Sequence, residues 1–452
     1  MKQITGVAPS GSMGSGYNLA SFKRAMQAKP DFIGQDAGST DMGPYYHGAD
    51  QAFLPLSAYR RDLAVMLAAA RAAKIPLMIG SAITNGSNTT LELMIRLVRE
   101  VAAEQKLSFK LAVISAEIDK AYLKRKIGAG PLESIGPDGI LTADTVDAAG
   151  PIVAQMGMEP FMRALDAGAD VIIAGRACDD AIFAAMPVLR GFAPGLSLHC
   201  GKILECAGLS AVPYDLGEPM IGRVYEDHFE VEPGNPDSRC TTVSVAGHSL
   251  YERSDPFLQA GPGGINDLTH AEFQQDGRKV QVRGSAYLPD TRYRVKLEAA
   301  EKLGYRSIVV VGIRDAVMIA QLDHVLDHAR ERAEERFGLA QNGINLLFRN
   351  YGKNGVMGDL EPDVSHVPKE IGLVIDVVAP DQDTATAVAM FTRGVLQHAD
   401  YPGILTTAGN MAYPFSPFGI PVGPAYRFSI YHLMPVSEPC ECFPIHYEDI
   451  KN

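Results

Sequence analysis

The chain has 452 residues, of which 46% are hydrophobic and 21% are charged, a composition that excludes a disordered or collagen-like protein. At roughly 100–200 residues per domain, this length suggests two to four domains. Acidic side chains number 53 and basic ones 41, and the net charge of −12, with no local basic cluster, argues against nucleic acid and anionic membranes as partners. The opening residues lack the features of a signal peptide, and no apolar stretch could span a bilayer, so we expect a cytoplasmic protein.

In chain order, the first 225 residues alternate short apolar runs with helix-like stretches, which is typical of a parallel sheet wrapped by helices. The predicted strands are 3–8, 31–35, 76–80, 110–115 and 170–174. The predicted helices between them are 17–28, 57–73, 88–105, 117–126 and 158–167. We therefore predict an α/β fold, in which residues 1–225 form an N-terminal domain with a mostly parallel sheet that carries the site.

After about residue 225 the pattern changes to alternating β-rich segments separated by Gly, Pro, Asn and Asp turns. The elements predicted further along are strand 307–313, helix 315–337, strand 345–351, strand 372–379 and helix 383–397. This mixture predicts a C-terminal α+β domain over 226–452, which could close over a site in the first domain.

The loop after the first strand, residues 9–16, is rich in glycine. Gly14 and the amides at the start of the next helix suit a phosphate or a carboxylate, although a plain tight turn explains the same residues. The spacing G-x-x-G-x-G matches neither the dinucleotide fingerprint nor a P-loop. The sequence therefore indicates no nucleotide cofactor, and the cofactor stays unknown.

The next two loops carry acidic and hydroxyl side chains. Loop 35–41 (QDAGSTD) places Asp36 and Asp41 at one strand end. Loop 80–88 offers Ser81, Thr84 and Asn85 as neutral hydrogen-bond donors, a role that simple capping of the following helix would also explain in part.

The fourth and fifth loops add further charged groups. Glu117 follows the fourth strand, where an acid at a helix N-terminus is favourable without any ligand. In loop 174–180 (AGRACDD), Arg176 suits bidentate capture of a carboxylate and Asp179 suits proton transfer, whereas a structural salt bridge would use the same residues.

Because parallel strands end on one side of a sheet, we expect one shared crevice. Its candidate acid/base residues are Asp36, Asp41, Glu117 and Asp179, and its candidate substrate-binding residues are Gly14, Ser81, Thr84, Asn85 and Arg176.

The six cysteines are too sparse for a secreted disulfide framework and none form paired zinc-finger motifs. His199, Cys200, Glu205 and Cys206 lie within eight residues, and a nucleophile, an acid/base pair or a metal site are all chemically open. Burial of the cysteines as small apolar side chains is the alternative. Whether a metal binds stays unknown at this point.

Four segments in order resemble the acyclic terpene utilisation family of AtuA-like proteins: DFIGQDAGSTDMG, AGADVIIAGRACDDA, GKILECAG and LTTAGNMAYPFSPFG. The resemblance extends from about residue 4 to about residue 435. It implies catabolism of branched terpenoid acids as coenzyme A thioesters and, in many members, a small partner subunit. Members close to the type protein have an acid loop that resembles Asp-Tyr-Leu-Ala-Glu, and because loop 35–41 differs, we expect a divergent substrate.

Our leading hypothesis is a catabolic lyase, a hydratase/dehydratase or a carbon–carbon lyase, that acts on a small carboxylic acid or its coenzyme A thioester. Such a reaction needs a base, an acid and fixed donors for developing negative charge. Two alternatives stay open: a hydrolase that uses Cys200 or Cys206 with His199, and a non-catalytic subunit of a two-component enzyme. A homo-oligomer is expected, since most soluble enzymes of this size form one.

Overall fold

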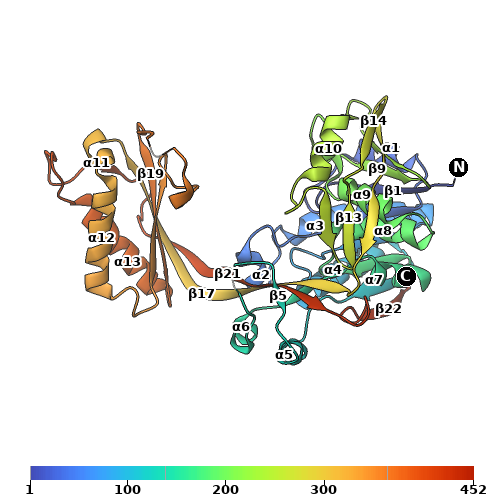
Figure 1. Ribbon diagram of the computed structural model, residues 1–452, viewed down its shortest axis with the longest axis horizontal. Helices are drawn as coiled ribbons and strands as arrows, with labels where there is room; N and C mark the ends of the chain where they lie inside the picture. The colour runs from blue at the N-terminus through green and yellow to red at the C-terminus, as the bar shows by residue number, and fades with distance from the viewer. Residues whose placement is uncertain (1, 138, 364, 452) are drawn as a thin grey trace. The chain divides into compact units, whose positions relative to one another are not determined.

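The computed structural model describes residues 2–137, 139–363 and 365–451. The chain divides into two compact units, Met1–Glu301 with Phe428–Asn452, and Lys302–Arg427 (Figure 1). The boundary expected at 225/226 instead falls inside the first unit. The reason is that β9 (Met220–Val224) and β10 (Phe229–Pro233), on either side of it, pair antiparallel in one sheet. The change to a β-rich pattern marks an extension of this sheet and not a new domain.

The first unit holds most of the strands and helices. Its strands are β1 (Ile4–Ala8), β2 (Phe32–Asp36), β3 (Leu77–Gly80), β4 (Phe109–Ile114), β5 (Glu133–Ser134), β6 (Val153–Gln155), β7 (Val171–Ala174), β8 (Ala211–Val212), β9, β10, β11 (Arg239–Cys240), β12 (Leu258–Gly261), β13 (Gly264–Asp267), β14 (Glu272–Asp276), β15 (Lys279–Arg283), β16 (Ala286–Pro289) and β22 (Ile445–Ile450). Its helices are α1 (Leu19–Met26), α2 (Pro44–Gly48), α3 (Leu56–Ala73), α4 (Asn88–Gln105), α5 (Lys120–Gly128), α6 (Ala143–Ala148), α7 (Glu159–Asp166), α8 (Asp179–Leu189), α9 (Pro194–Leu204), η1 (Ala207–Ser210) and α10 (Thr242–Leu250).

A ten-stranded sheet runs through the first unit in the order β14-β15-β10-β9-β1-β2-β3-β7-β4-β22. Its central strands β1, β2, β3, β7 and β4 are parallel, and antiparallel strands extend it on both sides. The predicted N-terminal strands are these parallel strands, which confirms the α/β class. Since their carboxyl ends share one edge, the loops singled out above all leave the sheet on that side.

Each face of the sheet packs against its own helices. In β7, Val171 and Ile173 belong to the core shared with α3 and α4, whereas Ile172 and Ala174 belong to the core shared with α8 and α9. Successive side chains of a strand point to opposite faces, so an unbroken apolar run such as DVIIA is expected when both faces are covered.

Helices α8 and α9 had not been predicted. They pack tightly against each other, and a Cβ at Gly201 would lie 2.3 Å from the Asp180 carbonyl oxygen. Both helices are buried over most of their surface. A helix that is covered on all sides lacks the one-sided apolar period by which helices are recognised in a sequence.

The second unit has a smaller sheet with helices on it. Its elements are α11 (Ala316–Ala320), α12 (Leu322–Phe337), β18 (Asn345–Tyr351), η2 (Gly358–Leu360), β19 (Ile371–Ala379), α13 (Gln382–Gln397) and β20 (Met411–Ala412), and two long strands, β17 (Arg294–Ile313) and β21 (Ile420–Pro435), contribute to both units. Helix α13 packs on β19 and beside α12 (Figure 1). The strands and helices predicted over 307–397 are confirmed, with the helix over 315–337 interrupted at Gln321.

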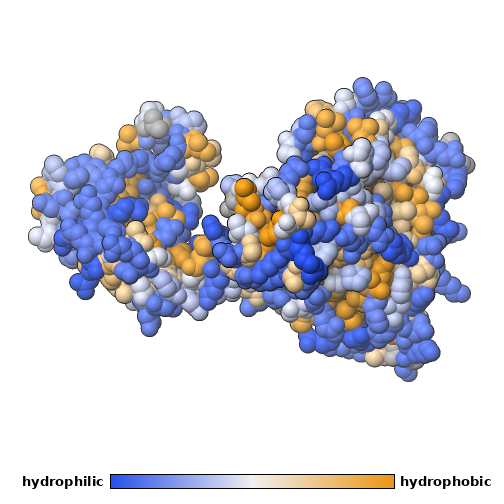
Figure 2. Space-filling model, turned by 60° about the horizontal axis from the view of Figure 1, so that its bottom comes forward, coloured by the Kyte–Doolittle hydropathy of each residue, from blue (hydrophilic) through white to orange (hydrophobic). Residues whose placement is uncertain are grey.

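On the face drawn in Figure 2, each unit mixes hydrophilic residues with smaller apolar patches. None of the helices in the described part of the chain combines the length and the apolar composition that crossing a bilayer requires.

Candidate functional site

Three of the loops at the carboxyl edge of the parallel strands are in direct contact. A Cβ at Gly38 would lie 2.3 Å from the Thr84 carbonyl oxygen, and a Cβ at Gly86 would lie 2.2 Å from the Arg176 backbone nitrogen. The absence of side chains at Gly38 and Gly86 therefore lets the loops after β2, β3 and β7 pack backbone against backbone. These three loops meet as the sequence predicts.

The loop after β3 has an unusual backbone. Ser81, Ile83 and Thr84 have φ angles of 50°, 47° and 67°, in the left-handed region that residues other than glycine rarely adopt. The loop is fixed by backbone hydrogen bonds from Ser81 to Gly175 and from Ala82 to Ala174, of 2.9 and 3.0 Å. Strain of this kind is concentrated at functional sites, where the surrounding structure sustains it.

Arg176 is almost completely buried, with 3% of its surface exposed. Its Nε donates to Glu298 Oε2 at 2.7 Å, and its Nη1 donates to Ser81 Oγ at 3.2 Å and to Asp179 Oδ1 at 3.5 Å. Arg176 thus forms the structural salt bridge that the sequence analysis gave as the alternative to carboxylate binding. The hydrogen bonds that Arg176 makes to described residues use Nε and Nη1, which leaves Nη2 for a ligand.

Glu298 of β17 is the residue that fixes Arg176, and the sequence analysis missed it. It also accepts hydrogen bonds from Thr40 Oγ1 at 3.0 Å and from Lys296 Nζ at 2.9 Å. Although burial opposes ionisation, the Arg176 and Lys296 cations hold the pKa of Glu298 well below its usual range. Its separation of 122 residues from Arg176 leaves no local sequence signal for this pair.

Asp36 and Asp179 lie beside Arg176 and differ in proton affinity. Burial, followed by the nearby charge of Asp179, raises the pKa of Asp36 well above its usual range, and Asp36 Oδ1 has no hydrogen-bond partner among the described residues. Burial raises the pKa of Asp179 to about 6, against the lowering effect of Arg176. The Asp179 side chain is 32% exposed, so solvent reaches it on one side. The pKa values of both carboxyl groups are thus raised beside the Arg176 cation, and the two groups differ in exposure.

Further buried ions lie behind this pair. Lys202 Nζ is 2.5 Å from Glu205 Oε1, and Arg253 Nη2 is 3.2 Å from Asp180 Oδ2. Burial raises the pKa of Glu205 to about 8, with Lys202 opposing and Asp179 adding to the rise. Lys202 and Arg253 had not been singled out, because a lone Lys or Arg carries no pattern in a sequence.

The remaining neutral candidates are engaged in holding the loops. The Gly14 amide donates to Asp62 Oδ2 at 2.8 Å. Thr84 Oγ1 accepts from the Phe53 amide at 2.8 Å. Asn85 Nδ2 donates to an Asp50 oxygen at 3.1 Å. The Gly14 amide and the side chains of Thr84 and Asn85 therefore stabilise the loops at the edge of the site, whereas Ser81 contacts Arg176 directly.

The other two acid/base candidates, Asp41 and Glu117, have surroundings of a different kind. Asp41 is exposed, and its backbone amide bonds to Ser39 Oγ. Glu117 Oε2 accepts from the Asn88 amide at 2.7 Å, at the first residue of α4. This is the helix-terminus arrangement weighed above as the alternative for Glu117.

His199 and Cys200 form part of the core. His199 Nδ1 lies 2.7 Å from Ser285 Oγ and Nε2 lies 2.8 Å from Ser249 Oγ, so both ring nitrogens have partners. Burial lowers the pKa of His199 to about 3 and raises that of the Cys200 thiol far above its usual range. A thiol without an available base is a poor nucleophile, and this geometry disfavours a cysteine hydrolase built on the pair.

Glu205 and Cys206 meet a histidine from another helix. The side chains of Glu205, Cys206 and His248 offer ligand atoms that lie within 4.8 Å of one another. The sequence analysis placed Glu205 and Cys206 in a cluster with His199, but the histidine that reaches them is His248 of α10.

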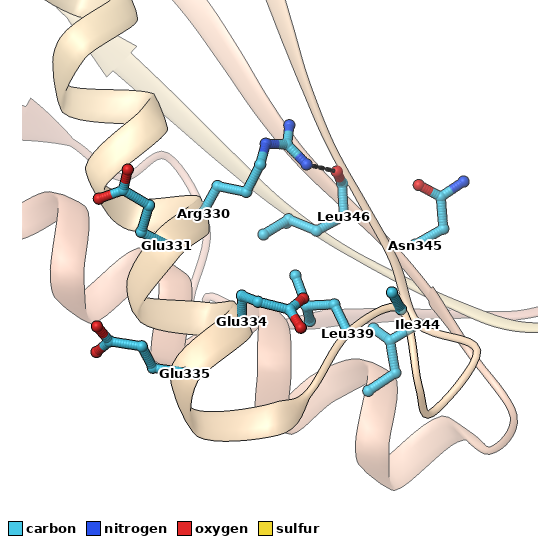
Figure 3. A pocket seen from close by; sticks show the side chains of 9 residues that line it. Arg330, Glu331, Glu334, Glu335, Leu339, Ile344, Asn345 and Leu346 are labelled. Carbon is cyan, nitrogen blue, oxygen red and sulfur yellow. Dashed lines mark hydrogen bonds between the residues drawn. The ribbon is translucent and has the colours of Figure 1, made fainter.

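One small cavity lies beside the buried ions, and a larger hollow lies on the second unit. A small cavity of about 20 Å³, lined in part by Cys178, Asp180 and Tyr287, has room for about one water molecule. A hollow of about 580 Å³ lies on the second unit between α12 and β18, where Glu331 and Glu335 point outward (Figure 3). It is an open surface of apolar, acidic and other polar side chains, among them Arg330, and we assign no chemistry to it.

Comparison with known protein families finds a match to the acyclic terpene utilisation family protein AtuA over residues 9–214 and 215–415. The chain belongs to the AtuA family. The family resemblance seen in the sequence is thereby confirmed, and the matched segments include Asp36, Arg176, Asp179 and Glu298. Neither the curated proteins nor the solved structures give a match to the chain.

Proposed function

We propose that this AtuA-family protein is a lyase that eliminates water from, or adds it to, a small carboxylic acid or its coenzyme A thioester. The observation that carries the proposal is the pair Asp36 and Asp179, whose pKa values are raised to different extents beside the buried cation of Arg176. Two carboxyl groups with separated proton affinities can act as acid and base at the same pH.

Each residue has a defined part in this reaction. Arg176 Nη2 binds the carboxylate or the carbonyl oxygen of the substrate and stabilises the negative charge that develops there. The Asp179 carboxylate takes the proton from the carbon next to that carbonyl, and the electrons of the broken C–H bond form the double bond. Asp36 gives its proton to the departing hydroxyl, which leaves as water. Glu298 keeps Arg176 in place without touching the substrate.

The family adds a direction to the choice of substrate. Its name refers to the use of acyclic terpenes, which suggests branched, unsaturated acids or their thioesters as candidates. We further propose that the protein acts in the cytoplasm on a small molecule and as a homo-oligomer, and that a small partner subunit accompanies it.

The test is a screen of branched 3-hydroxy acids and their coenzyme A thioesters for formation of the conjugated double bond. With the substrate so found, Asp36→Asn, Asp179→Asn and Arg176→Gln should each lower kcat/KM by about 100-fold or more. The matched control is Asp41→Asn, a carboxylate of the same loop that is exposed and outside the cluster, which should change kcat/KM less than about twofold. Retention of the wild-type rate by Asp36→Asn or Arg176→Gln would overturn the proposal.

A further inference from the structure

The side chains of Glu205, Cys206 and His248 converge from two packed helices. Glu205 is the C-cap residue directly after α9, Cys206 follows it, and His248 lies in the last turn of α10. Each offers one ligand atom, and the three atoms lie within 4.8 Å of one another. A nitrogen, a thiol sulfur and a carboxylate oxygen are the three ligand types that Zn²⁺ accepts.

The buried ring of His248 is a second feature that points to a ligand. The residue is 8% exposed, and its Nε2 has no hydrogen-bond partner among the described residues. An unpaired buried nitrogen is unfavourable, and a cation at Nε2 would satisfy it.

We propose that Glu205, Cys206 and His248 bind one Zn²⁺ ion, with the fourth position of the ion open to water or to a substrate oxygen. In tetrahedral coordination with bonds of about 2.0–2.3 Å, ligand atoms lie about 3.3–3.8 Å apart. From the separation of at most 4.8 Å, the three atoms need to approach by no more than about 1.5 Å.

The charges around the three residues balance such an ion. A Cys206 thiolate and a Glu205 carboxylate neutralise the two positive charges of Zn²⁺. Of the neighbouring cations, Lys202 lies 2.5 Å from Glu205 Oε1 and 3.1 Å from Glu252 Oε2, so Glu252 offsets it, and Arg253 pairs with Asp180. With Lys202 on Oε1, the other oxygen of Glu205 is left for the metal.

The proposed zinc ligands are different residues from the acid/base pair, and one of them is partly exposed. Cys206 is partly exposed, and Tyr251 Oη lies 3.4 Å from its Sγ. The lyase mechanism proposed above uses Asp36, Asp179 and Arg176 and does not require the ion. Binding of the metal is therefore measured without substrate, and either proposal can fail alone.

The test uses the full chain, purified with a reductant and freed of metal by a chelator. After equilibration with Zn²⁺ and dialysis, we expect about one zinc per chain by elemental analysis. Co²⁺ in place of zinc should give a thiolate-to-metal charge-transfer band. Cys206→Ser should remove this band, and His248→Gln should weaken Zn²⁺ binding by at least about tenfold, since even residues that only support metal ligands contribute 10- to 100-fold.

Matched controls are Cys440→Ser and His446→Gln, which remove the same atom types from the first unit outside the cluster and should leave zinc content and the cobalt band unchanged. Thermal unfolding of each metal-free variant checks that it folds. Zinc content far below one per chain in the wild type, or the same zinc affinity in folded Cys206→Ser and His248→Gln as in the wild type, would overturn the proposal.

Discussion

At the scale of single residues, the environment separates carboxyl groups that are identical in sequence. Asp36 is buried and has one oxygen that no described residue bonds, Asp179 is partly exposed beside Arg176, and Asp41 is exposed. Burial disfavours the charged form of an acid, and it raises the pKa of Asp36 well above its usual range and that of Asp179 to about 6. The residue type and the loop could be predicted from sequence, but the division of roles between Asp36 and Asp41 could not, because it depends on which neighbours enclose each carboxyl.

A pH profile follows from these pKa values. Since the base must be ionised, kcat/KM should rise with pH as Asp179 loses its proton, with an apparent pKa near 6. Since the acid must be protonated, the rate should fall at higher pH as Asp36 ionises. The measurement is kcat/KM from about pH 5 to 9, where about a tenfold decrease per unit is expected well below the lower apparent pKa.

The conservative variant Asp179→Glu tests the assignment of the acidic limb. This variant retains a titrating carboxyl in a changed position. The lower apparent pKa of the kcat/KM profile should therefore shift, while the decrease of kcat/KM at high pH should remain as in the wild type. A rate that decreases as pH rises through 6 would contradict a base with the pKa of Asp179.

At the scale of elements, the loop after β3 determines where Arg176 lies. Its left-handed residues and Gly86 bring the backbone against the loop after β7. Glycines and hydroxyl residues in loop 80–88 indicated a functional loop in the sequence. The left-handed conformation of Ser81, Ile83 and Thr84 was not predictable, because their residue types favour other backbone regions and only contacts with distant segments hold them there.

Replacement of Gly86 tests this close contact. Gly86 has a φ of 67°, and in Gly86→Ala the new Cβ would lie 2.2 Å from the Arg176 nitrogen. We expect a loss of more than about 3 kcal/mol of unfolding free energy or a large loss of turnover, because backbone atoms must move in addition to the left-handed penalty of about 1–2 kcal/mol. Urea denaturation and kcat/KM measure the two effects.

Gly191→Ala is the matched control for this substitution. Gly191 has a φ of 87° and no heavy atom within 4 Å of the position of a Cβ. It should therefore show the left-handed penalty alone, about 1–2 kcal/mol, with unchanged turnover. Equal effects of the two substitutions would show that the loops after β3 and β7 are not in close contact.

At the scale of the whole molecule, two units with separate cores share one chain. The first has apolar cores on both faces of its large sheet, and the second has its own core between β19 and helices α12 and α13. The proposed acid/base residues, Arg176 and the proposed zinc ligands all belong to the first unit. Units with independent cores are expected to respond separately to core substitutions.

A pair of isoleucine substitutions tests this independence. Ile375 of β19 and Ile173 of β7 are both fully buried, each in the core of its own unit. Ile375→Ala should lower the unfolding free energy of the second unit by about 2–5 kcal/mol and leave kcat/KM unchanged. Ile173→Ala should destabilise the first unit by a similar amount and lower kcat/KM, because Arg176 follows β7. Differential scanning calorimetry with activity assays distinguishes the two, and a loss of turnover in Ile375→Ala would contradict the assignment of the site to the first unit.

The sequence by itself determined the parallel strands, their order along the chain, most of the helices, the family and the loops that carry Asp36, Ser81, Arg176 and Asp179. Each of these leaves a signal within a few residues, as an apolar run, a turn or a motif. Only the tertiary structure decided the unit boundary, the burial of Glu298 against Arg176, and the meeting of His248 with Glu205 and Cys206. These features depend on contacts between segments far apart in the chain, and the free energy of burying a charge or a ring nitrogen is set by all the segments that surround it.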